Sequence, residues 1–536
     1  MIDELILAGN QIRLACDNYT RICLNVEKYL AQGGSLGLPS EVCHQLGTEL
    51  DELASCEVKI QEMKVSIHRA RNYSPGIAPI NSLPTEVFTR IFHYARPTCN
   101  LRLLSFCAKE HYPTYPDYLT HVCSLWRTIA ILSPSLWFHI DLTPDETHLD
   151  GLSDRAKVHV ARSGQVPLEL HSAGDTYHSG LVQPYKGLLP FVSQISPRVS
   201  SLRIEAREFG GLHRGILREL LLSQDSILTK LVIHSNRRWN TLSNCSFDYM
   251  GLEETWGNCL NLDLAADQLE RVFAPLTILR LRGTFPLWSS TAYHGLVDLR
   301  LLSPLEQVSI PEAELITILR SCPELSILYF KLRIHNLAFE TRQIEPVHLR
   351  DLQVVKIFWD YDEVPGPGSS SDILRLLAPG TKPLQLFLNS YHSSPTLLAN
   401  LNGFFSRSRV VMFHSKTPDP PMSIIRDAVH VEQVVIDRGR YSVRPPQSLV
   451  VGGFGSLRRL RSLTFMHCTI LEEELRSLVD YYPGGITLIS CNINYKGGGK
   501  RLEGRAEEFL DSFPSVHIVE MGYPFEDSVM NWETLD

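Results

Sequence analysis

A short hydrophobic motif that recurs along the chain limits most strongly what this sequence can fold into. In one copy, Leu276 is followed three residues later by Leu279 and two residues after that by Leu281. The alternation of apolar and polar residues predicts a short strand whose inward-facing side chains belong to a common core. Complete copies begin at Val199, Leu228, Leu276, Leu296, Leu325, Leu349 and Leu460, and shorter copies contain Leu386 and Leu388, Val411 and Phe413, Val434 and Ile436, Ile486 and Leu488, and Val516 and Ile518.

The spacing of the copies predicts that each strand belongs to a repeated unit. The central positions 279, 299, 328 and 352 are 20, 29 and 24 residues apart. Between two copies, residues Glu312–Ser321 have the pattern of a helix that would cover the strands. One such unit cannot bury its apolar face alone, so the units must stack. Burial of each Leu, Ile or Phe contributes roughly 1.5–3 kcal/mol, which suffices for a stable stack of about a dozen strands.

The unit resembles that of leucine-rich-repeat proteins, whose repeats are roughly 20–29 residues long. Cys468 and Cys491 stand near the position at which that family carries Asn or Cys after the strand. Most other copies lack this residue, and their spacing is irregular. The resemblance implies an irregular leucine-rich-repeat-like solenoid over residues 155–522, in which Val364–Ser371 forms a flexible insertion. An unrelated α/β fold with parallel strands is the alternative.

Two long helices are predicted at the N-terminus, over residues 2–31 and 41–70. Their apolar residues recur at helical spacing, and the stretch Gly33–Pro39 separates them. In the second helix the apolar steps alternate between three and four residues, which forms a short, imperfect heptad pattern. The favoured interpretation for residues 1–72 is an antiparallel hairpin packed on itself, and intermolecular coiled-coil pairing is the alternative.

A dense apolar module is predicted between residues 80 and 142. Asn81 or Ser82 can cap a helix that starts near Pro84, where the missing N–H costs nothing. Val87 and Ile91 share one face of that helix. A module of this size with several Leu, Phe and Trp residues has more apolar surface than its own core can hide, so it needs a partner.

Four pieces of this module resemble the F-box, in the order that the family has them. They are Leu83-Pro84-Thr85-Glu86, Ile91-Phe92, Val122-Cys123-Ser124-Leu125-Trp126-Arg127 and Pro134-Ser135-Leu136-Trp137. The connection Arg96–Asp117 is longer than is usual in the family. The resemblance implies a three-helix module that docks on a Skp-type adaptor, which is itself bound to a cullin.

The residues that the resemblance assigns to adaptor binding come from all four pieces. Leu83 and Pro84 are expected to fit an adaptor pocket, because they precede the helix, whereas Ile91, Phe92 and Trp126 are also expected to serve as core of the module. The complete predicted set is Leu83, Pro84, Glu86, Val87, Ile91, Phe92, Val122, Trp126, Leu136 and Trp137.

Composition and missing motifs exclude several functional classes. The net charge of −8 does not favour nucleic-acid binding, and no apolar run of about 20 residues predicts a membrane span. The twelve cysteines form no CxxC pair and no zinc spacing, so they are interpreted as small buried residues in a reducing compartment. The segment Lys496–Arg501 is not a phosphate-binding loop, and no hydrolase or dinucleotide motif is present. No metal, cofactor or catalytic residue is therefore predicted.

These observations predict an α/β protein with an all-helical N-terminal part and a leucine-rich-repeat-like solenoid. The predicted domains are a helical hairpin over 1–72, an F-box over 80–142, repeats over 155–522 and an acidic tail over 523–536. The expected function is that of a non-catalytic substrate adaptor of a Skp–cullin–F-box ubiquitin ligase, cytoplasmic or nuclear, with an unidentified target protein. The alternative is a repeat scaffold that binds proteins without any role in a ligase.

Overall fold

The computed structural model describes residues 1–32, 40–72, 76, 78–96, 115–174, 187–206, 211–235, 248–250, 264–303, 308–337, 345–358, 368–389, 395–416, 428–437, 460–482, 485–494 and 515–519. The chain forms two compact units. The first contains residues 1–87 and 123–125, and the second contains residues 88–122 and 126–536. The boundary between the units therefore crosses helix α3 (Thr85–Tyr94).

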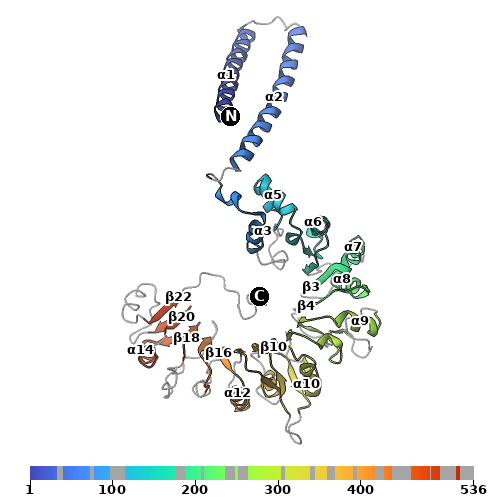
Figure 1. Cartoon of the computed structure of the whole chain (residues 1–536), viewed down its shortest axis with the longest axis vertical. Coiled ribbons are helices and arrows are strands. Elements are labelled where there is room, and N and C mark those ends of the chain that lie inside the picture. The colour runs from blue at the N-terminus through green and yellow to red at the C-terminus, as the bar shows by residue number, and fades with distance from the viewer. Residues whose placement is uncertain are drawn as a thin grey trace. The chain divides into compact units, whose positions relative to one another are not determined.

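The first unit is helical. It contains α1 (Ile2–Gln32), α2 (Ser40–Asn72) and the 3-10 helix η1 (Pro79–Ser82), and the two long helices are the blue ribbons of Figure 1. Both predicted helices are thus confirmed. No residue of α1 or α2 is buried, and the antiparallel hairpin packed on itself stays a prediction. The two helices are joined by the hydroxyl of Tyr19, which donates to the carboxylate of Glu49 over 2.7 Å.

The exposure of these helices corrects the prediction for the cysteines. Cys16, Cys23, Cys43 and Cys56 are exposed, whereas Cys322 and Cys468 are buried as expected. The physical reason is that α1 and α2 lack a common core in which a small apolar side chain could be enclosed.

In the residues that the structure describes, the second unit is built on a parallel sheet of fourteen strands. Each strand pairs with the strand that follows it in this sheet, so the order along the chain is also the order in space. A doubly wound α/β fold would reverse its strand order at a switch point, and this sheet has no such reversal. The strands are β1 (His139–Leu142), β2 (Leu168–Ala173), β3 (Val199–Ala206), β4 (Lys230–Ser235), β6 (Ile278–Arg282), β8 (Asp298–Leu302), β10 (Ile327–Lys331), β13 (Val354–Phe358), β15 (Leu384–Asn389), β16 (Val410–Lys416), β17 (Gln433–Asp437), β18 (Ser462–Met466), β20 (Ile486–Ile489) and β22 (Val516–Val519).

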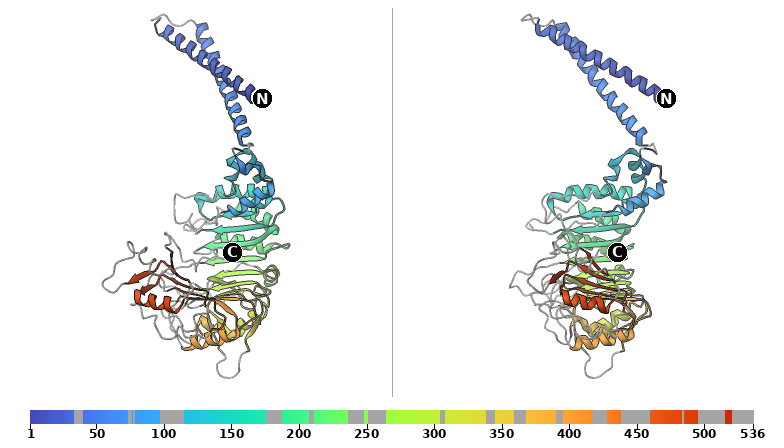
Figure 2. Two further views of the ribbon diagram at one scale, coloured as in Figure 1. Left: turned by 60° about the vertical axis from the view of Figure 1, so that its left-hand side comes forward. Right: turned by 90° about the vertical axis from the view of Figure 1, so that its left-hand side faces the viewer.

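The helices of the second unit follow one side of this sheet, as Figures 1 and 2 show for α7 to α14. Their apolar faces and the inward side chains of the strands form one core that extends from Ile140 in β1 to Val516 in β22. The predicted helix Glu312–Ser321 is confirmed as α10 (Glu312–Arg320). The others are α4 (Leu119–Val122), α5 (Ser124–Ile131), α6 (Glu146–Arg162), α7 (Leu188–Ile195), α8 (Gly211–Leu222), α9 (Ala266–Phe273), α11 (Ile373–Leu376), α12 (Pro395–Arg407) and α14 (Glu472–Tyr481).

Short elements connect the strands to the helices. Four pairs of short strands are parallel: β5 (Asp248–Met250) with β7 (Thr284–Pro286), β9 (Ser309–Pro311) with β11 (Arg333–His335), β12 (Val347–Leu349) with β14 (Leu377–Pro379), and β19 (Thr469–Leu471) with β21 (Asn492–Asn494). The remaining 3-10 helices are η3 (Pro134–Leu136), η4 (Ser196–Arg198), η5 (Thr291–Tyr293) and η6 (Ser370–Asp372).

The register of the strands tests the predicted copies of the motif. Leu279, Leu299 and Leu328 occupy equivalent positions in neighbouring strands, as predicted. Two copies are displaced along the chain from their predicted positions. Leu328 pairs with Val355, so the copy that was predicted to begin at Leu349 is instead formed by Leu352, Val355 and Ile357. In the second copy the central position is Phe413, because it pairs with Leu386 and Val434. The Leu349–Ile357 segment contains apolar residues in both alternation phases, and pairing with β10 decides which phase faces the core. The copy at Phe413 is displaced by two residues and keeps its phase.

The same turn follows several strands. Gly283, His467 and Ser490 come directly after β6, β18 and β20, and all three have positive φ angles of 84°, 49° and 49°. Each donates its backbone N–H to the last part of the next strand, over 3.1 Å to the carbonyl of Leu302, 3.0 Å to that of Ile489 and 3.3 Å to that of Val519. The repeated bond fixes the spacing between consecutive strands.

Two cysteine thiols each contact the preceding strand near the C-terminal end of the sheet. Cys468 lies 3.5 Å from the carbonyl oxygen of Ile436, and Cys491 lies 3.2 Å from that of Phe465, in each case on the preceding strand. Each thiol can therefore donate to a backbone carbonyl of the preceding strand.

Half of the predicted flexible insertion is part of the core. Ser370 and Ser371 are buried in η6, and the hydroxyl of Ser370 donates to the carbonyl of Leu332 over 3.0 Å. The prediction of flexibility is therefore wrong for Gly368–Ser371, because these serines find backbone partners inside the protein. Residues 364–367, most of the long F-box connection, the Lys496–Arg501 segment and the acidic tail lie outside the described residues. In the described part of the chain, no helix is both long enough and apolar enough to cross a membrane.

Candidate docking helix and polar network

Helix α3 is anchored by two phenylalanines that lie one turn apart. Phe88 and Phe92 are fully buried, and their ring centroids are 5.7 Å apart. The indole of Trp126 lies 5.8 Å from Phe88 and 5.1 Å from Phe92, so the three rings form one aromatic cluster. Tilted and edge-on ring contacts of this kind add to the stability that burial provides.

Leu136 and Trp137, the last residues that match the F-box pattern, are also buried. Trp137 is fully buried, its indole N–H donates to the carbonyl of Ala130 over 2.7 Å, and its ring packs edge-on against His159 at 5.0 Å. Leu136 is buried beside it. Phe92, Leu136 and Trp137 belong to the predicted adaptor-binding set, but their burial assigns them to the core instead. Trp126 and Ile91 are half-buried.

The opposite side of α3 and the turn before it are exposed. Leu83 has 37% and Val87 has 40% of its surface exposed, and Pro84 and Glu86 are exposed as well. The helix begins here because the N–H of Val87 donates to the carbonyl of Pro84 over 3.0 Å, and Glu86 in the first turn complements the helix dipole. Val122, at the end of α4, is 54% exposed. Every predicted contact residue that precedes Phe88 therefore lies at the surface.

Two serines after α5 hold α3 in place. Thr89 and Ser133 are linked by a 3.1 Å hydrogen bond between their hydroxyls, and Nε2 of His93 lies 3.0 Å from the hydroxyl of Ser135. Burial lowers the pKa of His93, and the nearby Arg96 lowers it further, which favours the neutral imidazole. The role of these serines was not predicted, because small polar residues on either side of a proline carry no distinctive pattern.

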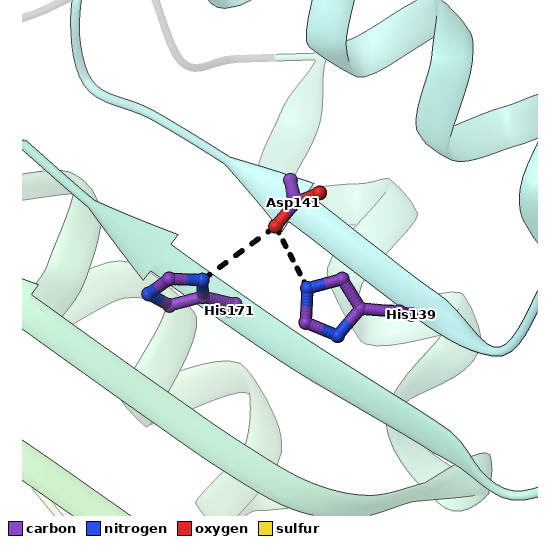
Figure 3. A group of neighbouring side chains, drawn as sticks. All are labelled: His139, Asp141 and His171. Carbon is purple, nitrogen blue, oxygen red and sulfur yellow. Dashed lines mark hydrogen bonds and ion pairs between the residues drawn. The ribbon is translucent and has the colours of Figure 1, made fainter. Parts of the chain in front are cut away.

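A cluster of two histidines and an aspartate lies on the first two strands of the sheet. His139 and Asp141 alternate along β1, and Asp141 pairs in register with His171 of β2, so all three side chains project from the same face (Figure 3). Oδ1 of Asp141 lies 2.9 Å from Nε2 of His139 and 3.5 Å from Nδ1 of His171. Asp141 and His171 are buried, and His139 is partly exposed. The absence of any zinc spacing in the sequence had predicted no such group.

Charged side chains surround this cluster. Arg96 and His139 Nδ1 both contact the carboxylate of Glu169, at 3.0 and 3.3 Å. Arg155 bridges Asp117 at 2.7 Å and Asp141 at 3.2 Å, by way of its Nε and one of its terminal nitrogens. We refer to Arg96, Asp117, His139, Asp141, Arg155, His159, Glu169 and His171 as the polar network.

The carboxylates of the polar network stay ionised. Burial alone would raise the pKa of Asp117, but hydrogen bonds from His159 and Arg155 outweigh it and lower that pKa to about 2. Burial likewise opposes the effect of His139 and Arg96 on Glu169, whose pKa is lowered to about 2. Burial also opposes the ionisation of Asp141, but the contacts of its carboxylate with His139 and His171 outweigh burial, and its pKa lies well below the ordinary value.

A second group, of basic and aromatic side chains, lies further along the sheet on the same face, which is the face that the helices do not cover. In-register pairing aligns six side chains on consecutive strands, and we call them the charged row: Arg280, Arg300, Tyr329, Lys356, Phe387 and His414. The guanidinium of Arg300 lies 4.2 Å from the Tyr329 ring centroid, and Nζ of Lys356 lies 4.3 Å from that of Phe387. Burial lowers the pKa of Lys356 to about 8, and Arg300 adds to this effect.

No protein-family model matches this chain. No curated protein matches it either. What the chain does must therefore be argued from its own residues and contacts.

Proposed function

We propose that this chain is the substrate-recognition subunit of a Skp–cullin–F-box ubiquitin ligase. In this proposal residues 80–142 are an F-box that binds a Skp-type adaptor, and the parallel sheet is a leucine-rich-repeat-like solenoid that binds the target protein. The chain itself carries out no bond chemistry, and its place of action is the cytoplasm, the nucleus or both.

The observation that carries the proposal is the two-sided character of α3. Phe88 and Phe92 fasten one side of the helix inside the protein, whereas Leu83 and Val87 remain about 40% exposed on the other side. Covering each of these aliphatic side chains would contribute on the order of 1 kcal/mol, and an exposed proline next to them adds a rigid surface. An apolar face held in a fixed orientation suits a docking role, and its residues are those at which the F-box pattern places the adaptor contact.

The repeated architecture supports the second half of the proposal. Strands that follow one another in chain order, with helices along one side, leave the other side of the sheet available to a ligand. The charged row lies on that side, and Phe387 and Lys416 there are half-buried. Arg280 and Arg300 of the charged row are buried and paired with Asp298, so they serve as interior of the sheet face and not as ligand contacts. The partly exposed Phe387 and Lys416 favour a target segment that carries an acidic group.

The mechanism would be positional. Binding of the adaptor by the F-box and of the target by the repeats brings the target lysine close to the ubiquitin-carrying enzyme. The gain is an effective concentration, which replaces an encounter between two freely diffusing proteins.

Capture of a purified Skp-type adaptor by the purified chain tests the proposal. The double substitution Leu83→Ala with Pro84→Ala, and separately Val87→Glu, should weaken capture at least tenfold without changing the urea midpoint of unfolding, because these side chains are exposed. Leu287→Ala is a matched control, since Leu287 is 45% exposed on a different part of the chain. If the wild-type chain does not capture the adaptor, or if both variants capture it fully, a repeat scaffold without a ligase role becomes the better account.

A further inference from the structure

We propose that His139, Asp141 and His171 bind one divalent transition-metal ion of the zinc class, in a site with three protein ligands. The proposal is independent of the docking function of α3. It rests on the geometry of the three side chains, on the charge that surrounds them and on the groups that orient them.

The geometry suits a small ion. Each of the three residues offers one ligand atom, and these atoms all lie within 4.8 Å of one another. The ligand atoms of a tetrahedral zinc ion are roughly 3.3–3.5 Å apart, because zinc–nitrogen and zinc–oxygen bonds are about 2.0–2.2 Å long. The observed separation of 3.5 Å between Asp141 Oδ1 and His171 lies at the upper end of this range, and the separation of 2.9 Å from His139 is shorter, so small side-chain rotations would admit an ion. Figure 3 shows both imidazole rings directed at the same carboxylate oxygen.

The surrounding charge favours a cation. The polar network contains three carboxylates (Asp117, Asp141 and Glu169) and two guanidinium groups (Arg96 and Arg155), so with neutral imidazoles it has one negative charge in excess. Asp141 is buried, and a buried carboxylate requires positive partners. Arg155 meets this requirement at Oδ2. A divalent ion would add a positive partner at Oδ1, where the two histidines lie, and would draw its other ligands from their neutral imidazoles.

The contacts of the ligands also resemble those of a metal site. In the structure, Nδ1 of His139 accepts from a guanidinium nitrogen of Arg96 at 3.0 Å and lies 3.3 Å from the carboxylate of Glu169. If Nε2 of His139 binds the ion, the ring proton moves to Nδ1, which then donates to Glu169 in place of accepting from Arg96. Carboxylates commonly orient metal-binding histidines in this way. Arg96 keeps its own ion pair with Glu169, and Arg155 holds Oδ2 of Asp141 at 3.2 Å, which leaves Oδ1 for the ion.

The donor set defines the class of ion. Two imidazole nitrogens and one carboxylate oxygen suit Zn²⁺ or Co²⁺, whereas Mg²⁺ and Ca²⁺ prefer oxygen ligands alone. Three protein ligands leave one position for water or for a carboxylate from another molecule. Because His139 is on β1 and His171 is on β2, the ion would also cross-link the first two strands of the sheet.

The test uses the purified full chain after chelator treatment, titrated with Zn²⁺ in a calorimeter and with Co²⁺ in a spectrophotometer. We expect one equivalent of each metal and the visible absorption of tetrahedral Co²⁺. Asp141→Asn and His171→Gln should weaken binding at least tenfold, and His139→Gln serves as a further variant at a less buried position. His294→Ala, which removes an exposed histidine elsewhere in the second unit, should bind as the wild type does.

Two results would overturn the proposal. One is the absence of stoichiometric binding by the folded wild-type chain. The other is binding that survives all three substitutions in variants whose circular dichroism is unchanged. In the second case the exposed Cys16, Cys23, Cys43 and Cys56 would be the source, and replacing these cysteines by serine would abolish it.

Discussion

The indole N–H of Trp137 donates a 2.7 Å hydrogen bond to the carbonyl oxygen of Ala130. This bond joins the segment before β1 to the last turn of α5, at a point where the Trp137 ring is fully buried and the guanidinium of Arg162 lies 4.3 Å from its centroid. Trp137 therefore links the helical module, the first strand and α6.

Replacing Trp137 by phenylalanine should destabilise the second unit. The substitution removes the bond to Ala130, leaves that carbonyl buried and opens a small cavity, which together cost on the order of 2–4 kcal/mol. Urea unfolding followed by far-ultraviolet circular dichroism measures the loss. A change below about 0.5 kcal/mol would contradict the central position that we assign to this side chain.

Lys356 should make stability depend on pH in the alkaline range. The pKa of its ammonium group is lowered from 10.5 to about 8 in the folded chain, so the folded state releases this proton more readily than the unfolded state does. The penalty for burying the charge is fully present below pH 8 and is relieved as the pH rises from about 8 to 10.5.

Lys356→Met removes the buried charge and should accordingly stabilise the protein at pH 7 by on the order of 1–3 kcal/mol. The gain is limited because the substitution also removes the cation–π contacts with Tyr329 and Phe387. The advantage of the variant over the wild type should shrink between pH 8 and pH 10.5. Urea midpoints of both proteins across this range provide the measurement, and a variant that is less stable at pH 7 would show that the ammonium group is well compensated.

The ionised carboxylate of Asp117 should stabilise the folded state at pH values above the ordinary pKa of an aspartate. Its pKa falls from 3.8 to about 2 through the contacts with His159 and Arg155, so the contribution is present above about pH 4 and is lost as the pH falls through 2. Asp117→Asn should therefore lower the urea midpoint at pH 6, and the difference from the wild type should vanish near pH 2. Asp154→Asn is the control, since the exposed Asp154 contacts only Lys157 in the described structure. A constant difference at all pH values would indicate packing rather than charge.

Gly368 should not tolerate a side chain. Its φ angle is +90°, and a Cβ atom would lie 2.3 Å from the carbonyl oxygen of Ile334. Gly368→Ala is expected to destabilise the chain by about 2 kcal/mol or more, through backbone strain and this contact. Gly295→Ala separates the two effects, because Gly295 has a φ of +65° with nothing within 4 Å of the added atom. Equal thermal shifts for the two variants would rule out the contact with Ile334 as a cause.

Much of the second unit could be predicted from local pattern. The motif at Leu279, Leu299 and Leu328 predicted strands, and these residues lie in register in the sheet. Alternation is a property of the strand itself, so it is visible in one segment at a time. Where two phases were possible, as at Leu349–Ile357, pairing with β10 decided between them.

The polar network could not be predicted in this way. His139 and His171 are separated by a whole helix, and only the parallel register of β1 and β2 places their rings on one carboxylate. A sequence spacing reveals a metal-ligand pair when both ligands lie in one turn or hairpin, and these ligands do not. Similarly, the heptad pattern of α2 did not reveal that its apolar residues would remain exposed.

The sequence by itself determined the two N-terminal helices, the strands at Leu279, Leu299 and Leu328, and which residues of 80–142 match the F-box pattern, because these properties depend on the order of neighbouring side chains. Tertiary structure alone decided that Phe92, Leu136 and Trp137 are interior while Leu83 and Val87 are exposed. It also decided that Asp141 lies between two histidines. Burial and long-range contact depend on what the rest of the chain packs against each residue, and a local pattern does not contain that information.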